Sequence, residues 1–288
     1  MTPILYPPSR PQSVGEVLDT GFRIFTASLV KCLPYAALAV VSGQLPTLYQ
    51  VAAGRSLLQA AAQQRYRDPV WWLLEVLAIV GTITLSNALL MRQHALATGR
   101  PAVTGTELAR GLRLMPGVLL IGLLIVLAMV PSGMLAAFFV GALRGHTSGL
   151  VILLAVIVAL TPAAWLLVRW SCSVTTLVVI GRPALDSMSH SWRLTAGSLW
   201  RLSVIYTVAL ILIVVLYVLS GIISGIVSLL IARGDIAVFT ATAAAIVVLL
   251  GAIATPFYSA LALAVLGDLS VRKEGGDLAQ RIAAPAMQ

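Results

Sequence analysis

The sequence predicts an all-α polytopic membrane protein. Six transmembrane helices are expected as three hairpins, each preceded by an amphipathic cytoplasmic helix at the membrane interface. Of the 288 residues, 59% are hydrophobic and 10% are charged, and the mean hydropathy is +0.99, far above that of water-soluble domains. Six apolar stretches are long enough to cross a bilayer, and basic residues are distributed unevenly among the connecting segments. Residues 1–288 are therefore expected to form a single membrane domain.

The six predicted spans are residues 28–53, 70–91, 117–143, 149–180, 202–232 and 236–267. Crossing the hydrocarbon core takes about 20 helical residues, so the longer stretches predict tilted helices or helices that continue beyond the lipid. The connections at residues 144–148 and 233–235 are very short. The spans that they join must then be antiparallel neighbours, which is why hairpins are predicted.

The distribution of basic residues predicts that both termini are cytoplasmic. With the N-terminus inside, the cytoplasmic segments hold 14 of the 19 Lys and Arg residues, as the positive-inside rule requires. The five that remain outside are Arg55, Arg65, Arg67, Arg144 and Arg233. The formal net charge of +9 is thus explained by topology and by anionic lipid. The lipid bilayer is the expected partner, and no nucleic acid is expected.

Each predicted hairpin follows a segment with the pattern of an amphipathic helix. An Arg-Pro pair opens each segment, and two of these pairs lie within identical Gly-Arg-Pro-Ala sequences at residues 99–102 and 181–184. Ser13 with Glu16, and Thr104 with Glu107, have the spacing of capping boxes, and Asp186 is the expected cap of the third helix. Apolar residues follow at helical spacing in all three segments.

The three similar segments predict internal repeats over residues 13–91, 104–180 and 186–267. Two interpretations of the amphipathic helices remain open. They can lie at the inner membrane surface as structural elbows. Alternatively, they can dock lipid head groups or a membrane or cytoplasmic protein. The basic residues available for such contacts are Arg110, Arg113, Arg193 and Arg201.

Short motifs at both ends of the chain are distinctive. They are Ser-Val-Gly-Glu-Val-Leu-Asp-Thr-Gly-Phe-Arg at 13–23, Trp192-Arg193, and Asp-Leu-Ser-Val-Arg-Lys-Glu-Gly-Gly-Asp-Leu at 268–278. Together they resemble the bacterial membrane domain named after glycerophosphoryl diester phosphodiesterases. The resemblance implies a membrane domain of the bacterial inner membrane. Some members carry a catalytic barrel, but no polar stretch here is long enough to form one, so phosphodiesterase activity is not implied.

No motif in the sequence indicates catalysis or a cofactor. There is no His-Glu-x-x-His pair, no Gly-rich phosphate loop followed by Lys, and no serine elbow with plausible partners. Cys32 and Cys172 provide neither a disulfide framework nor a metal-ligand spacing. We therefore expect no catalytic residue, no bound metal and no cofactor, and an enzyme is the least supported class.

Glu75 is the only acidic residue within a predicted span. It lies near the outer end of the second span, beside Trp71 and Trp72, so a carboxylate that reaches interfacial water explains it. The alternative is an intramembrane proton or cation site, with Gln44 or Tyr49 as the partner.

Two faces of small residues predict close helix packing, either within the chain or between copies. One is formed by Gly133, Ala137 and Gly141, and the other surrounds Gly221 and Gly225. Three hypotheses for function follow. The leading one is a noncatalytic integral inner-membrane accessory or scaffold protein, with a protein partner or as a homo-oligomer. The second is a permease or channel-like component for a lipid or amphipathic solute. The third is a membrane enzyme of glycerophospholipid metabolism.

Overall fold

The computed structural model describes residues 5–52, 68–145, 147–232 and 236–275. Within these ranges the regular structure is entirely helical. The helices are α1 (Val14–Gly43), α2 (Leu45–Ala52), α3 (Pro69–Ala97), α4 (Thr104–Leu143), α5 (Gly149–Arg169), α6 (Ser173–Thr175), the π-helix η3 (Thr176–Ile180), α7 (Ala184–Thr195), α8 (Leu199–Ala232) and α9 (Ile236–Glu274).

Six helical segments among the described residues are long and apolar enough to cross a membrane. This confirms the predicted all-α class and the number of candidate spans, and it identifies a multi-pass membrane protein. The segments are Val14–Gly43, Pro69–Ala97, Thr104–Leu143, Gly149–Ile180, Leu199–Leu230 and Val248–Glu274.

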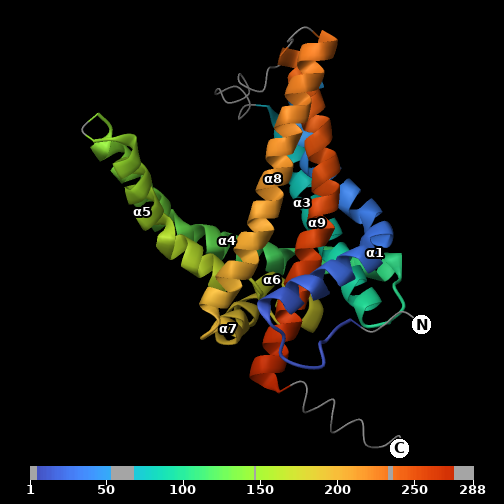
Figure 1. The fold of residues 1–288 in the computed structure, drawn as a ribbon. Helices are drawn as coiled ribbons and strands as arrows, with labels where there is room; N and C mark the ends of the chain where they lie inside the picture. The colour runs from blue at the N-terminus through green and yellow to red at the C-terminus, as the bar shows by residue number, and fades with distance from the viewer. Residues whose placement is uncertain (1–4, 53–67, 146, 233–235, 276–288) are drawn as a thin grey trace, which may run out of the picture.

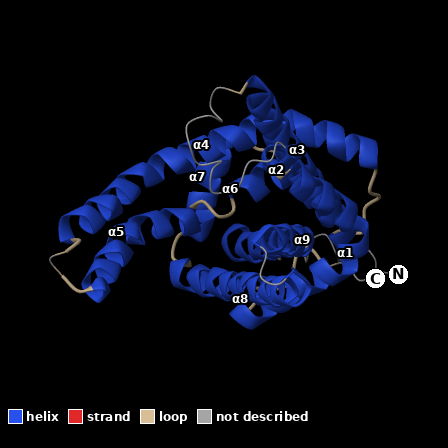
Figure 2. Ribbon diagram, turned by 90° about the horizontal axis from the view of Figure 1, so that it is seen from above, coloured by secondary structure: helices blue, strands red, loops and turns tan. Residues whose placement is uncertain are grey.

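The centre of the molecule is formed by α1, α3 and α9, with α8 packed along α9. Figure 1 shows α8 and α9 side by side, with the first half of α1 crossing the lower part of α9, and Figure 2 shows α9 between α8 and α3. The second half of α9 is the most buried part of the described chain, and Leu261, Leu263, Leu266 and Leu269 are fully enclosed there. The core therefore lies at the end of the bundle where α1 crosses it.

The pair formed by α4 and α5 diverges from this centre. Figures 1 and 2 both show the connected ends of α4 and α5 far from α8 and α9. In α5 only Ala159 and Ala163 are buried, and in α4 beyond Ile121 only Ser132 and Ala136 are buried. Most side chains of this pair thus face the surroundings of the protein.

Two predicted amphipathic segments are the first turns of longer helices. Residues 14–27 continue into the first span within α1, and residues 104–116 continue into the third within α4. The capping box of Ser13 and Glu16 is confirmed. The expected cap of Thr104 and Glu107 is wrong, because Val103 is the N-cap and Glu107 is turned to Arg92.

The expected cap by Asp186 is also wrong. Pro183 precedes the first turn of α7, and the helix has no side-chain cap. Asp186 instead lies inside that first turn, where a negative charge favours the helix dipole.

Two predicted spans are interrupted. The first breaks at Gln44, between α1 and α2, because Pro46 has no amide proton to continue the helix. The fourth breaks after Arg169, where the side chain of Ser191 replaces helical hydrogen bonds. Its hydroxyl donates to the Arg169 carbonyl (2.8 Å) and accepts from the Cys172 amide (3.2 Å).

The two Gly-Arg-Pro-Ala sequences adopt similar local structures. Gly99 and Gly181 both have positive φ angles, +69° and +83°; Gly99 follows the C-cap of α3, Thr98, and Gly181 is the C-cap of η3. This left-handed conformation ends a helix and favours glycine. In both places the Arg-Pro pair then leads into the next helix. The likeness is local, and the larger threefold repeat stays a prediction.

Candidate functional site

Several buried polar side chains lie at the end of the bundle where α1 crosses α3 and α9. Asp268 in α9 is only 2% exposed. Its carboxylate accepts from Nη1 of Arg201 in α8 (2.6 Å), from Nε of Arg272 (3.1 Å) and from the backbone amide of Gln12 (2.7 Å). Both arginines also donate to the Gln12 carbonyl. We call these four residues the Asp268 cluster.

The Asp268 cluster fixes the N-terminal segment to the last two helices. Farther along that segment, Tyr6 and Pro8 lie against Gly267, where an added Cβ would come within 2.9 Å of the tyrosine ring. Burial raises the pKa of Tyr6 to about 12, so its hydroxyl is neutral at physiological pH. The segment before α1 is therefore part of the folded core.

A second buried ion pair joins α1, α3 and α4. Nη2 of Arg92 lies 2.8 Å from Oε2 of Glu107, which also accepts a hydrogen bond from the hydroxyl of Tyr35 at 3.0 Å. The Arg92 guanidinium stacks over the Tyr35 ring, 4.6 Å from its centroid, and donates to the Thr104 hydroxyl. Oε1 of Glu107 is buried without a hydrogen-bond partner.

Gln93, fully buried on α3, links α3 to α1 and α9. Its amide donates to the hydroxyl of Ser28 (3.3 Å) and to the carbonyl of Pro256 (2.8 Å), and its carbonyl accepts from the hydroxyl of Ser259 (2.7 Å). Since a buried amide without partners is costly, these bonds specify how the three helices meet.

The junction between α5 and α7 is aromatic and basic. The Arg169 guanidinium lies between Trp165 and Trp192, 5.3 Å and 4.9 Å from the two ring centroids. Cation–π contacts of this kind stabilise a charge where water is scarce. Trp165, Arg169 and Trp170 thus meet around the Trp192 ring.

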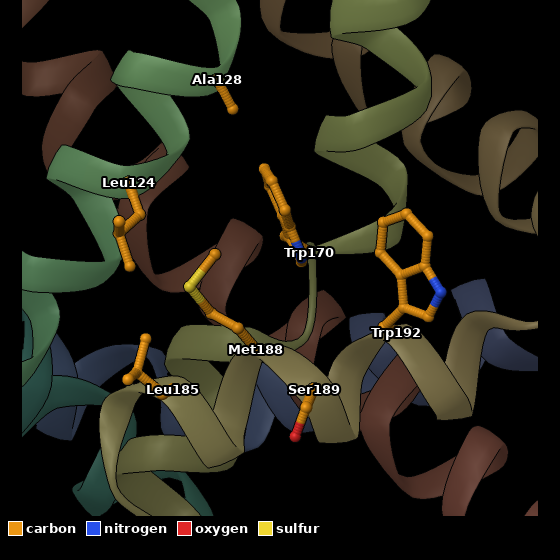
Figure 3. Close-up of a pocket in the computed structure, with 7 residues that line it drawn as sticks. All are labelled: Leu124, Ala128, Trp170, Leu185, Met188, Ser189 and Trp192. Carbon is orange, nitrogen blue, oxygen red and sulfur yellow. The ribbon is translucent and has the colours of Figure 1, made fainter.

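An apolar cavity of about 430 Å³ opens beside this junction, between α4 and α7. Figure 3 shows Leu124 and Ala128 of α4 facing Trp170 and Met188 across the gap. Ser189 points away from it (Figure 3). The accessible surface of the lining is almost entirely apolar, so the cavity fits a hydrocarbon chain better than a polar solute.

The intramembrane polar site of Glu75 and Gln44 stays a prediction. Glu75 is half-buried near the start of α3, and the backbone amide of Gln44 binds carbonyls at the end of α1. Among the described residues there is no hydrogen bond between their side chains.

The four arginines expected to contact head groups or a partner occupy different environments. Arg113 and Arg193 are exposed, on α4 and α7. Arg110 is also exposed, and its Nη2 lies 3.7 Å from the position that a Cβ on Gly181 would occupy. Arg201 is bound to Asp268, and its guanidinium is committed to the Asp268 cluster.

His190 is the buried histidine of α7. Its Nε2 lies 3.5 Å from Oε1 of Glu274. Burial lowers the pKa of His190, an effect that Arg182 and Arg193 reinforce and that Glu274 opposes. The neutral ring is favoured in the folded protein.

Comparison with known proteins adds no identification. No family model matches the chain, and no curated protein and no solved structure is significantly similar to it. Among the described residues, no group of three or more His, Cys, Asp and Glu side chains could hold a metal ion.

Sequence reasoning missed the residues that form the buried polar contacts, above all Asp268, Arg92 and Gln93. A signal existed for each, because polar residues at the ends of apolar spans require partners. The identity of the partners could not be read from the sequence, since Gln12 and Asp268 are 256 residues apart.

Proposed function

We propose that the chain is a noncatalytic accessory or scaffold protein of a bacterial inner (plasma) membrane, with both termini in the cytoplasm. Its six spans form three hairpins, and amphipathic segments at the cytoplasmic surface lead into each. The divergence of α4 and α5 from the bundle supports this proposal most directly. These two helices form an arm that binds a transmembrane segment of another membrane protein.

The arm carries an unused small-residue face. Gly133, Ala137 and Gly141 are exposed along α4, and a Cβ added at either glycine would meet no atom within 4 Å. Small residues at this spacing allow helices in a membrane to approach closely. The face that the sequence predicts for helix packing is therefore available to another chain.

The cytoplasmic end of the molecule gives the arm a rigid base. Arg92, Glu107 and Tyr35 bind the first turn of α4 to α1 and α3. Asn87 donates to the Gly111 carbonyl, and Gly111 packs directly against the backbone of α3. A scaffold requires a stiff connection of this kind between its docking surface and its body.

The proposed family is that of the bacterial membrane domain named after glycerophosphoryl diester phosphodiesterases. The residues that carry the resemblance have structural roles: Ser13 and Glu16 cap α1, and Asp268 and Arg272 belong to the Asp268 cluster. These roles supply a physical reason for the motifs, since each motif fixes an end of the core.

Photocrosslinking in cells tests the scaffold proposal. A photoreactive amino acid at Phe138, exposed on the arm, should give one discrete adduct that is heavier than the protein and contains a second membrane protein. The matched control is Val30, which is exposed on α1 and should give no such adduct. Adducts only with lipid, or the same adduct from both positions, would contradict the proposal.

The apolar cavity supports a second candidate, a carrier or permease for a lipid or other amphipathic solute. Its volume of about 430 Å³ and its tryptophans suit an acyl chain. Ala128→Trp fills the cavity and should abolish any thermal stabilisation by added lysophospholipid. Equal stabilisation of both proteins would reject this candidate.

A further inference from the structure

A second cavity lies where the first Gly-Arg-Pro-Ala segment meets η3. Its volume is about 250 Å³. Its lining includes His94 and Ala95 near the end of α3 and Val178 and Val179 of η3. The cavity combines polar and apolar walls at the ends of two candidate membrane spans, α3 and α4. A ligand here would contact both a polar surface and the edge of the lipid.

Positive charge on this cavity is uncompensated. Arg100 and Arg110 both line it, and the structure gives neither guanidinium a hydrogen bond or ion pair with any described residue. Two guanidinium groups on the wall of one cavity repel each other, so an anion that contacts both of them would be stabilised.

The start of α4 adds hydrogen-bond donors. Val103 and Thr106 line the cavity, and Val103 is an N-cap without a side-chain cap. The first amides of α4 are therefore free of side-chain acceptors, and such amides favour a phosphate group.

Glu107 also lines the cavity, but its charge is already paired with Arg92. Its buried Oε1 has no hydrogen-bond partner. Because this oxygen can still accept a hydrogen bond, it favours a ligand that carries a hydroxyl or ammonium donor beside its phosphate.

We propose that this cavity binds the phosphate of an anionic phospholipid whose head group also carries a hydroxyl donor. Arg100, Arg110 and the first amides of α4 hold the phosphate, and Glu107 accepts from the hydroxyl. The apolar wall of Val178 and Val179 directs the acyl chains to the lipid. The proposal goes beyond the scaffold function and does not depend on it.

Thermal stability in nanodiscs tests the lipid site. Dioleoylphosphatidylglycerol should raise Tm relative to dioleoylphosphatidylcholine, and the double variant Arg100→Gln/Arg110→Gln should lose at least half of that rise. Arg113→Gln is the matched control, because Arg113 is exposed on the same helix and does not line the cavity. It should keep the full rise.

A second variant tests whether the shape of the cavity, and not only its charge, is needed for lipid binding. Ala95→Leu narrows the cavity without removing a charge, and it should also reduce the rise in Tm caused by phosphatidylglycerol. An equal loss in Arg113→Gln and in the double variant would show general surface attraction and overturn the proposal. The same would follow if phosphatidylglycerol gave no rise, or if Ala95→Leu kept all of it.

Inorganic phosphate distinguishes the source of the anion. Added to the protein in phosphatidylcholine nanodiscs, it should give little stabilisation, because it has no acyl chains to contact the apolar wall of Val178 and Val179. A rise in Tm equal to that from phosphatidylglycerol would overturn the assignment to lipid. The crosslinking result at Phe138 is independent of all these measurements.

Discussion

Replacement of Asp268 by Asn removes the only negative charge of the Asp268 cluster. The carboxylate accepts three hydrogen bonds from Arg201, Arg272 and the Gln12 amide at 2.6–3.1 Å. The variant keeps the shape of the side chain but leaves two guanidinium groups facing each other. The Gln12 carbonyl and the one remaining side-chain oxygen are then the acceptors for both of them, and the new amide NH2 adds a donor among donors.

The expected loss of stability follows from the burial of these groups. Removal of one partner from a buried ion pair costs about 3–5 kcal/mol. The side chains of Arg201 and Arg272 keep 20% and 33% exposure, so water partly solvates them and the lower end, about 3 kcal/mol, applies. For a chain of this size that corresponds to a fall in Tm of roughly 6–12 °C.

Asp19→Asn is the matched control for this prediction. Asp19 pairs with Arg23 at 2.8 Å, but both side chains are more than half exposed, and surface pairs contribute about 0.2–1 kcal/mol. The assay is thermal unfolding of both variants in the same detergent, followed by intrinsic tryptophan fluorescence. Equal Tm values for Asp268→Asn and Asp19→Asn would refute the stabilising role of the cluster.

Three further substitutions test other parts of the structure. Gly111→Ala places a Cβ 2.6 Å from the Thr84 carbonyl oxygen and should cost about 1–3 kcal/mol in thermal unfolding. Gly105→Ala, which meets no atom within 4 Å, should cost nothing measurable. The pKa of His190 is lowered in the folded state, so stability should be full above its ordinary value of 6.5 and decrease as the pH falls below it. A Tm series should show a smaller decrease for His190→Gln, and identical pH profiles would contradict the buried neutral ring. Glu75→Gln should keep folding and cellular function, because a half-buried carboxylate near a helix end reaches water; a folded but inactive variant would favour the proton or cation site.

Local features of the sequence were the most predictable. The Ser13 and Glu16 capping box is confirmed because both partners lie within one turn. Thr104 and Glu107 have the same spacing but form no capping box, because the Glu107 carboxylate binds Arg92 and Tyr35 instead. The competing contacts are stronger because they satisfy a buried charge. A local pattern could not reveal partners that tertiary folding brings to it.

The positions of the spans in the sequence were predicted better than the contacts between the spans. Hydropathy identified six candidate spans because it depends on composition alone. The break after Arg169 was missed, since it depends on hydroxyl groups of α7. Arg201 was expected to face a head group or partner, but its guanidinium binds Asp268. Its basic charge was visible in the sequence, whereas its partner, 67 residues later, was not.

The most direct test of the scaffold proposal is the effect of the small-residue face on crosslinking at Phe138. The double variant Gly133→Leu/Gly141→Leu adds bulk where the chain itself makes no contact, so folding and Tm should be unchanged. The account predicts that the Phe138 adduct with a second membrane protein is lost in this variant and kept in Gly105→Leu. An undiminished adduct in Gly133→Leu/Gly141→Leu would contradict the proposed docking role of α4 and α5.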